Sequence, residues 1–305
     1  MVKKKYSLKK KIQISGILNN IESKINENKI IKDLDGYHGS SSAHVIGITG
    51  PPGVGKSSLI NNLIKVIRSK KLSVAIIAID PSSQKSKGAL LGDRARFDID
   101  PSDYAVFARS LASKDSLGGV SDMTYPYMIV LRSFFDILII ETVGVGQSEI
   151  SIKNIADTVI FCVQPGSGDS LQFMKSGIIE IPDIICVTKN DLNILANNTL
   201  IDLQGVNQYF NSQLNWEIKT TSISSKKNSG FENLYKLIED RWEWLNLGNK
   251  LIEMRKVQDI EWIKKTIIDK VGMFGYLKLK NKIEYKNKPF SSLKKIFEKI
   301  KIEII

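Results

Sequence analysis

One eight-residue stretch constrains the fold of this chain more than any other. Residues 50–57 read Gly-Pro-Pro-Gly-Val-Gly-Lys-Ser, which fits the pattern G-x-x-x-x-G-K-[ST]. The apolar run Val45–Ile48 leads into it, and Leu59, Leu63 and Ile67 follow at helical spacing. A strand, a glycine-rich loop and a helix in this order turn backbone N–H groups and a helix N-terminus toward phosphate oxygens. The stretch therefore predicts a site for a nucleoside triphosphate.

The residues of this loop have separate roles in the predicted site. The ammonium group of Lys56 can reach the β- and γ-phosphates, and the hydroxyl of Ser57 can ligate Mg²⁺. The nucleotide-binding residues expected here are Gly50, Pro51, Pro52, Gly53, Val54, Gly55, Lys56, Ser57 and Ser58.

Strand-like and helical segments alternate from residue 43 to about residue 247. This alternation predicts an α/β fold with a doubly wound, mostly parallel sheet, in which ligands bind at the carboxyl ends of the strands. The expected strands are Val45–Ile48, Val74–Ile79, Tyr104–Ala108, Ile137–Ile140, Val159–Val163, Ile184–Val187 and Glu217–Thr221.

Helical extensions are expected on both sides of this domain. Apolar residues at helical spacing predict a helix over residues 8 to about 31, followed by a polar linker at 35–42, so residues 1–42 form an N-terminal extension. Residues 248–305 form a C-terminal helical arm. Its lysine-rich end after Met273 is too short and polar for a core of its own, so we expect it to pack on a partner subunit or to fray.

Acidic residues near the predicted strand ends are candidate metal ligands. Asp80 ends the second strand, and Asp93 lies in a segment with two glycines at 88–96. Both carboxylates could contact Mg²⁺ or its waters. Arg94 or Arg96 could approach phosphate, although an ordinary surface loop with ion pairs would contain the same residues.

A second loop motif follows the strand Ile137–Ile140, where residues 141–147 read Glu-Thr-Val-Gly-Val-Gly-Gln. Glu141 can bind Mg²⁺ through water, and the Gly144 N–H can meet the γ-phosphate, so loss of that phosphate would release the loop. Many small GTPases have a water-orienting glutamine directly after this glycine. Here that residue is Val145, so we expect slow hydrolysis by the free protein.

The base-binding motif follows the strand Ile184–Val187, where residues 188–191 read Thr-Lys-Asn-Asp and fit [NT]-K-x-D. The Asp191 carboxylate can accept the N1–H and N2 amino hydrogens of guanine, which adenine lacks, and the Lys189 stem can cover the base. Thr188, Lys189 and Asp191 therefore predict GTP rather than ATP. Ser222 and Ile223 occupy the place of the short loop that meets guanine O6.

Composition argues against several other functions. The net charge of +12 could indicate a nucleic-acid or anionic-membrane partner, but the lysines are spread out and lack interleaved aromatic residues, so we expect neither. Cys162 and Cys186 lie in apolar runs, which predicts buried thiols rather than a disulfide or metal site. No apolar run approaches membrane-spanning length, and no apolar stretch follows the first lysines, so we expect no signal peptide and a cytoplasmic protein.

These motifs, in this order, resemble the methylmalonyl-CoA mutase-associated G-protein chaperones of the MeaB/ArgK type, which are P-loop GTPases of the SIMIBI class. The resemblance covers roughly residues 14–265. It implies GTP/GDP and Mg²⁺ as ligands and a catalytic set of Lys56, Asp80, Asp93, Arg96 and Glu141, with Ser57, Asp80, Asp93 and Glu141 around the metal. The matching segments are residues 50–57, 80–83, 91–93 with Arg96, 117–119, 141–149, and 165–169 with Leu171 and Gln172 as a third switch loop.

The resemblance implies a GTP-hydrolysing homodimer that gates cofactor loading and protects an adenosylcobalamin-dependent acyl-CoA mutase of the methylmalonyl-CoA mutase type. One alternative is a GTPase that serves another metalloenzyme, but such proteins usually need Cys or His ligands, which this chain lacks at suitable spacing. Another is a P-loop kinase of a small molecule or transport protein, against which Asp191 argues. Thr188 stands where the family usually has Asn, which predicts weaker base affinity, and residues 120–124 lack the usual basic side chains.

Overall fold

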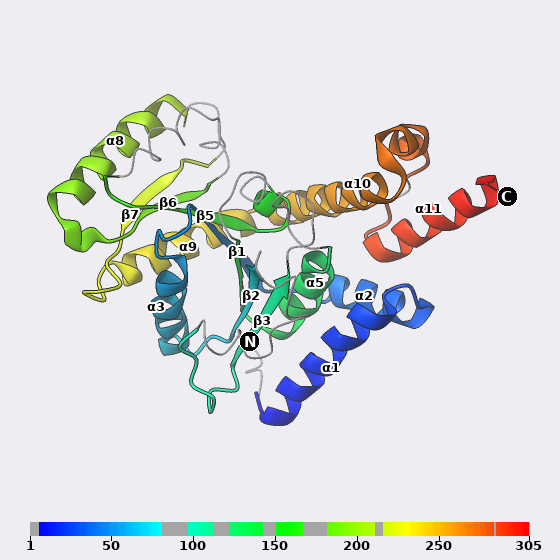
Figure 1. Ribbon diagram of the computed structural model, residues 1–305, viewed down its shortest axis with the longest axis horizontal. Coiled ribbons are helices and arrows are strands. Elements are labelled where there is room, and N and C mark those ends of the chain that lie inside the picture. The colour runs from blue at the N-terminus through cyan, green and yellow to red at the C-terminus, as the bar shows by residue number, and fades with distance from the viewer. Residues whose placement is uncertain are drawn as a thin grey trace.

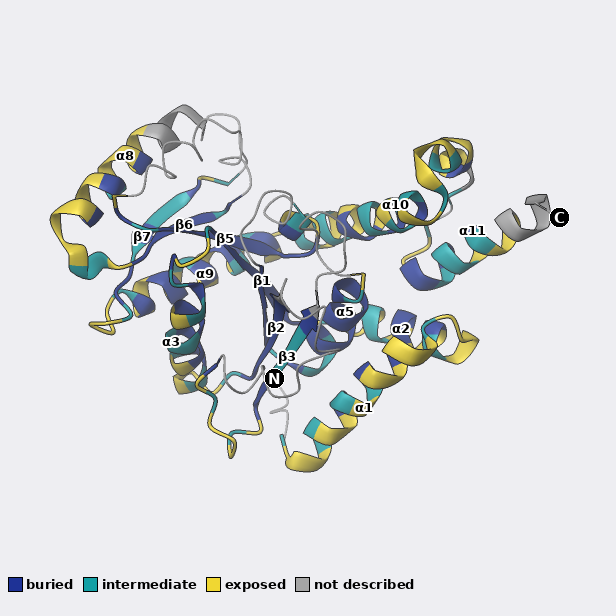
Figure 2. Ribbon diagram, in the orientation of Figure 1, coloured by how far each residue is buried: buried dark blue, intermediate teal, exposed yellow. Residues whose placement is uncertain are grey.

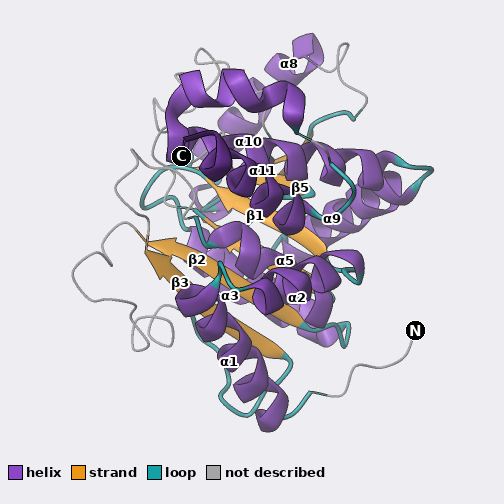
Figure 3. Ribbon diagram, turned by 90° about the vertical axis from the view of Figure 1, so that its right-hand side faces the viewer, coloured by secondary structure: helices purple, strands orange, loops and turns teal. Residues whose placement is uncertain are grey.

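The computed structural model describes residues 6–80, 97–112, 122–142, 151–166, 182–210, 216–283 and 285–304. Its strands form one parallel sheet in the order β3-β2-β4-β1-β5-β6-β7 (Figure 1). Figure 3 shows the arrowheads of β2 and β3 pointing the same way. The strands are β1 His44–Thr49, β2 Val74–Asp80, β3 Val106–Ala112, β4 Ile137–Glu141, β5 Thr158–Val163, β6 Ile184–Val187 and β7 Lys219–Ser222. The predicted α/β fold with a parallel sheet is confirmed.

The third predicted strand was wrong at both ends, since β3 begins at Val106 and continues to Ala112. The residues before it form a turn instead. The Asp103 carboxylate accepts the Ala105 N–H at 3.1 Å, and the Val106 N–H donates to the Asp103 carbonyl at 3.2 Å. These local bonds hold the chain out of the sheet until Val106.

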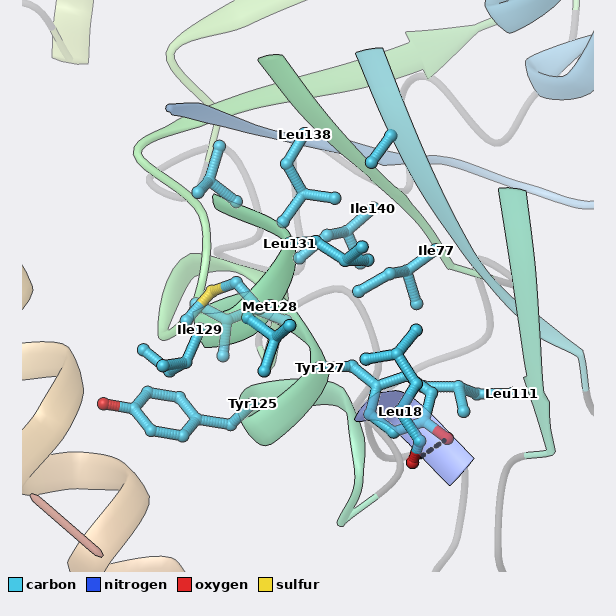
Figure 4. Close-up of a cluster of buried hydrophobic side chains, with 14 of the residues drawn as sticks. Leu18, Ile77, Leu111, Tyr125, Tyr127, Met128, Ile129, Leu131, Leu138 and Ile140 are labelled. Atoms are coloured by element: carbon cyan, nitrogen blue, oxygen red, sulfur yellow. Dashed lines mark hydrogen bonds between the residues drawn. The ribbon is translucent and has the colours of Figure 1, made fainter. Parts of the chain in front are cut away.

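Helices cover both faces of the sheet, which is therefore doubly wound (Figure 1). Ile46 and Ile48 of β1 face a cluster shared with α3 and α9, whereas Val45 faces a cluster shared with α1, α2 and α5. Figure 4 shows the second cluster, in which Tyr127 of α5 donates to the Leu18 carbonyl at 3.3 Å. The helices are α1 Leu8–Lys24, α2 Asn28–Gly39, α3 Lys56–Ser69, α5 Thr124–Phe134, α8 Ile194–Phe210, α9 Phe231–Asn246, α10 Lys250–Leu279 and α11 Pro289–Ile304.

The N-terminal extension differs from its prediction. The expected single helix is two helices, because the chain turns at Ile25–Glu27 and α2 begins at Asn28. The expected linker at 35–42 is helical as far as Gly39. Leu34 and Asp35 are buried there, and the Asp35 carboxylate accepts the backbone N–H groups of Phe290 and Ser291 at 3.1 Å each. Burial and these long-range bonds override the low helix propensity of Asp35 and the two glycines, Gly36 and Gly39.

The C-terminal end also corrects the prediction, because its described residues pack on this chain. α10 bends at Gly272, which has φ 72°, and the chain returns through a short 3₁₀ helix at Lys280–Lys282 to α11. The Phe290 ring packs at a tilt against the rings of Tyr125 and Trp262, and Ile296 joins a small cluster with Ile263 of α10. Figure 2 shows buried residues along the inner sides of α10 and α11. The domain limits at 42/43 and 247/248 stay a prediction.

Candidate nucleotide site

The phosphate loop, residues 50–55, connects the carboxyl end of β1 to the start of α3. Three of its glycines have positive φ angles: 138° at Gly50, 75° at Gly53 and 104° at Gly55. A Cβ at Gly50 would lie 2.4 Å from the carbonyl oxygen of Cys162 in β5. The loop therefore needs glycine at this position both for its backbone conformation and for its close approach to β5.

Lys56 and Ser57 begin α3 and point in different directions. The Lys56 side chain is 7% exposed, and its Nζ donates to the Gly50 carbonyl at 2.6 Å and to the Pro51 carbonyl at 3.0 Å. The Ser57 Oγ donates to Glu141 Oε1 at 3.0 Å. Glu141 is 1% exposed at the end of β4, which pairs directly with β1. The structure thus brings the first motif and the start of the second into contact, as predicted.

The side chains at this contact fit a magnesium site by their chemistry. Ser57 supplies a hydroxyl oxygen and Glu141 a carboxylate, and Mg²⁺ prefers such hard oxygen ligands together with phosphate oxygens. Within the described part of the chain, no three His, Cys, Asp or Glu side chains gather in a way that could hold a metal ion. Asp80 ends β2, but its side chain is not described. Asp93, Arg96 and Gly144 lie outside the described residues, so their roles stay predictions.

The two cysteines are buried free thiols, as predicted. Burial raises the pKa of Cys162 to about 12, and the nearby Glu141 carboxylate adds to the rise, although Lys56 opposes it. The thiol below the phosphate loop is therefore neutral at physiological pH and packs as an apolar side chain.

The base motif is tied to the phosphate loop by Thr188 and Lys189. The Thr188 hydroxyl, buried at 3% exposure, donates to the Val54 carbonyl at 2.7 Å. The Lys189 Nζ donates to the Gly53 carbonyl at 3.2 Å and to Gln164 Oε1 at 2.7 Å. Both motifs therefore belong to one site at the carboxyl edge of the sheet, where the doubly wound fold predicts ligands.

Asp191 lies in a short 3₁₀ helix after β6, and sequence reasoning missed its partner. The Ser224 hydroxyl donates to Asp191 Oδ1 at 2.6 Å, and this bond is the main cause that lowers the pKa of Asp191 below its ordinary value. The carboxylate is therefore charged at neutral pH, as a guanine acceptor must be. Only the short separation of Ser224 from the predicted Ser222 and Ile223 could have suggested it.

Ser222 and Ile223, which are predicted to meet guanine O6, lie beside the base motif. The Ile223 N–H donates to the Val187 carbonyl at 2.8 Å, and the Ile223 carbonyl accepts the Asn190 N–H at 2.9 Å. Ser222 is the last residue of β7. Both residues hold the base motif in place, and their contact with the base stays a prediction.

A buried ionic contact joins the C-terminal arm to the segment that follows the second loop. Asp157 is 1% exposed, and its carboxylate accepts from Arg255 of α10 at 3.0 and 2.7 Å and from the Val45 N–H at 2.8 Å. Nearby, Asp259 of α10 accepts from His38 at 2.8 Å and from the hydroxyls of Tyr125 and Tyr285. No local sequence pattern marks these partners, which are 26 to 221 residues apart.

The comparisons with known proteins agree with this geometry. A family model described as methylmalonyl-CoA mutase-associated GTPase MeaB matches residues 18–274. A Pyrococcus abyssi protein whose name classes it as a GTPase is 38% identical over 254 residues, 81% of this chain and 76% of its own length. The GTPase ArgK of Escherichia coli is 31% identical over 74% of this chain and 70% of its own length.

One solved structure supports the fold. The crystal structure described as LAO/AO transport system kinase has a TM-score of 0.64 and covers 95% of this chain and 93% of its own. At 21% identity it is evidence for the shared architecture alone. Among the described helices, none combines the length and apolarity that crossing a bilayer requires.

Proposed function

This chain belongs to the MeaB family of methylmalonyl-CoA mutase-associated GTPases, and we propose that it is the GTP-driven chaperone of an adenosylcobalamin-dependent acyl-CoA mutase. Its chemistry is GTP hydrolysis, and the proposed task is to gate cofactor loading and to protect the mutase. The observation that carries the proposal is the 3.0 Å bond from Ser57 to Glu141. It joins the phosphate loop to the residue at which the second loop motif begins.

Nucleotide binding would change this bond. Ser57 and Glu141 would hold Mg²⁺, which neutralises charge between the β- and γ-phosphates when it is bound. Lys56 would exchange the Gly50 and Pro51 carbonyls for phosphate oxygens. Its three donors can bridge those oxygens without breaking the loop. The set proposed to complete the reaction is Asp80, Asp93, Arg96 and Gly144.

Residues that follow the second loop motif in the chain contact the arm. Residues 143–150 connect Thr142 to Ser151, and Asp157 beyond them is bound to Arg255 of α10. Gln258 of α10 also donates to the Ala156 carbonyl at 2.8 Å. A shift of Glu141 on nucleotide binding would therefore act on a chain segment that leads to residues bound to the arm. In this way the nucleotide state could alter a surface that contacts the partner.

We further propose a cytoplasmic homodimer that uses the C-terminal arm. Large apolar side chains on α10 are exposed, among them Ile252 at 67% and Phe274 at 73%, and such side chains favour burial in an interface.

The test is the GTPase rate measured against rising concentrations of purified methylmalonyl-CoA mutase. We expect faster hydrolysis, and calorimetry should give different mutase affinities for the GDP form and for the form with a non-hydrolysable GTP analogue, because coupling between sites is reciprocal. Lys56→Ala is the control that removes hydrolysis without touching the arm. Flat rates and equal affinities across candidate mutases would reject the chaperone role and leave the GTPase assignment intact.

A further inference from the structure

A cavity of about 320 Å³ lies on the C-terminal arm, where it is formed by α11 and the turn before it. It is separate in sequence from every motif of the nucleotide site. Lys288, Ser292, Lys295 and Lys299 line it at intervals of four, three and four residues, which places them on one face of the helix. Lys286, in the turn, adds a fourth lysine.

Three of the lysines of this cavity lack an acidic partner in the described part of the chain. No Asp or Glu is among the described residues that line it, and Lys288, Lys295 and Lys299 form no ion pair with any residue that the structure describes. By contrast, Lys294, one position away on α11, pairs with Glu298 at 3.4 Å. Like charges on one helix face repel one another, so the cavity is a site where an anion would relieve repulsion.

Ser292 adds a hydroxyl group to the lining of this cavity. The residue is only 6% exposed, it lines the cavity, and its hydroxyl makes no hydrogen bond with the described part of the chain. Its oxygen is not among the buried side-chain atoms that lack a partner, so the hydroxyl stays accessible and can bind a ligand or water in the cavity. The neighbouring Ser291 differs, because its hydroxyl donates to Asp35.

The helix N-terminus itself is already satisfied. Asp35 accepts the backbone N–H groups of Phe290 and Ser291, and Asp35 does not line the cavity. Recognition in the cavity would therefore rest on the lysine ammonium groups and the Ser292 hydroxyl rather than on the first turn of α11.

We propose that this cavity binds a compact phosphate-bearing anion, with a diphosphate group as the best match. Lysine ammonium groups bind phosphate as mobile point charges, and several of them around one cavity favour a ligand with more than one negative charge. The Ser292 hydroxyl can donate to a phosphate oxygen. The volume corresponds to the lower end of small-ligand pockets, at roughly 300 Å³. The source is a soluble diphosphate ester or a phospholipid headgroup.

The test uses full-length protein carrying Lys56→Ala, which weakens the phosphate loop as a competing site, without Mg²⁺. Inorganic pyrophosphate is titrated by calorimetry at low and high salt. We expect one binding event that weakens with salt, because the lysines are exposed. Replacing Lys295 and Lys299 by Gln together should weaken binding about five- to tenfold, and Ser292→Ala about threefold. The matched control is Lys294→Ala, which should change affinity less than about twofold. Melting temperatures confirm that each variant is folded.

A second arm separates the sources. Vesicles of neutral lipid with and without anionic phospholipid are tested for co-sedimentation with the same variants. If the protein binds pyrophosphate but not anionic vesicles, the ligand is a soluble diphosphate ester. If it binds both, and Ser292→Ala weakens both, the ligand is a phospholipid headgroup. The proposal is overturned if pyrophosphate does not bind, whether or not vesicles bind. It is also overturned if Lys294→Ala weakens pyrophosphate binding as much as the replacement of Lys295 and Lys299 does. Neither result bears on GTP hydrolysis or on the mutase.

Discussion

The contact between Asp157 and Arg255 allows a quantitative prediction for Arg255→Met. Methionine keeps much of the apolar volume of the side chain but leaves the Asp157 carboxylate, which is 1% exposed, without its cation. Breaking a buried pair by removing one partner costs about 3–5 kcal/mol. The entropy of unfolding is about 2.1 cal/mol/K per residue, so the 305 residues contribute about 0.64 kcal/mol/K and the melting temperature should fall by about 5–8 °C.

The loss of stability should depend on pH. Burial alone would raise the pKa of Asp157, but the Arg255 ion pair and hydrogen bonds outweigh it and hold the pKa below its ordinary value. In the wild type, the ionised Asp157 carboxylate therefore stabilises the folded state at pH values above its unfolded pKa. This stabilisation disappears as pH falls through the folded pKa. In the variant, burial would dominate and raise the pKa, so its stability would fall as pH rises above about 4. The difference between the two proteins should therefore be smallest in acid below the lowered folded pKa of the wild type, grow as pH rises, and be largest near neutral pH.

Denaturant unfolding at several pH values measures this difference. Arg255→Met combined with Asp157→Asn is the matched control, since it removes the stranded charge and should recover part of the lost stability. A loss below about 1 kcal/mol at neutral pH, or one that is independent of pH, would refute the reasoning.

Three other predictions concern the site and the core. Lys56→Ala should weaken triphosphate binding and remove hydrolysis with little change in melting temperature; wild-type GTP turnover by the purified variant would contradict the phosphate-loop assignment. Asp191→Asn should weaken GTP binding at least severalfold, because an unpaired polar group costs about 1–3 kcal/mol, and should favour a xanthine nucleotide; an unchanged GTP-over-ATP preference in competition binding would exclude Asp191 as the base reader. Burial lowers the pKa of His44 to about 3, so between this pH and about 6.5 the unfolded chain binds a proton that the folded chain does not. The free energy of unfolding should therefore decrease as pH drops below about 6.5. Unfolding curves of His44→Gln should show a smaller decrease over the same pH range.

Local spacing was enough to predict the nucleotide-binding half of the molecule. Each predicted strand was found in the sheet, and the residues after β1, β4 and β6 meet at one edge, because parallel strands bring their carboxyl ends together. The ends of the strands were predicted less accurately than their positions along the chain. At β3 the side chain of Asp103 holds two residues out of the sheet, a competition that hydrophobic pattern does not reveal.

The structure of the two extensions could not be predicted in the same way. Residues 35–39 have the composition of a linker, yet they are helical because Asp35 caps α11, 255 residues further along the chain. The lysine-rich end folds back because Phe290 packs against Tyr125 and Trp262. The conformation of these two segments depends on which distant surface can bury an apolar side chain or accept a hydrogen bond from a backbone N–H.

The sequence by itself determined the phosphate loop, the [NT]-K-x-D motif and which segments form strands, since each depends on residues within a few positions of one another. The tertiary structure alone decided that Ser224 supports Asp191, that Arg255 pairs with Asp157, and that Ser292 lines one cavity together with lysines of α11 and the turn before it. The physical reason is that burial and the partners of a charge are properties of the assembled fold. A residue's neighbours in the chain do not specify them.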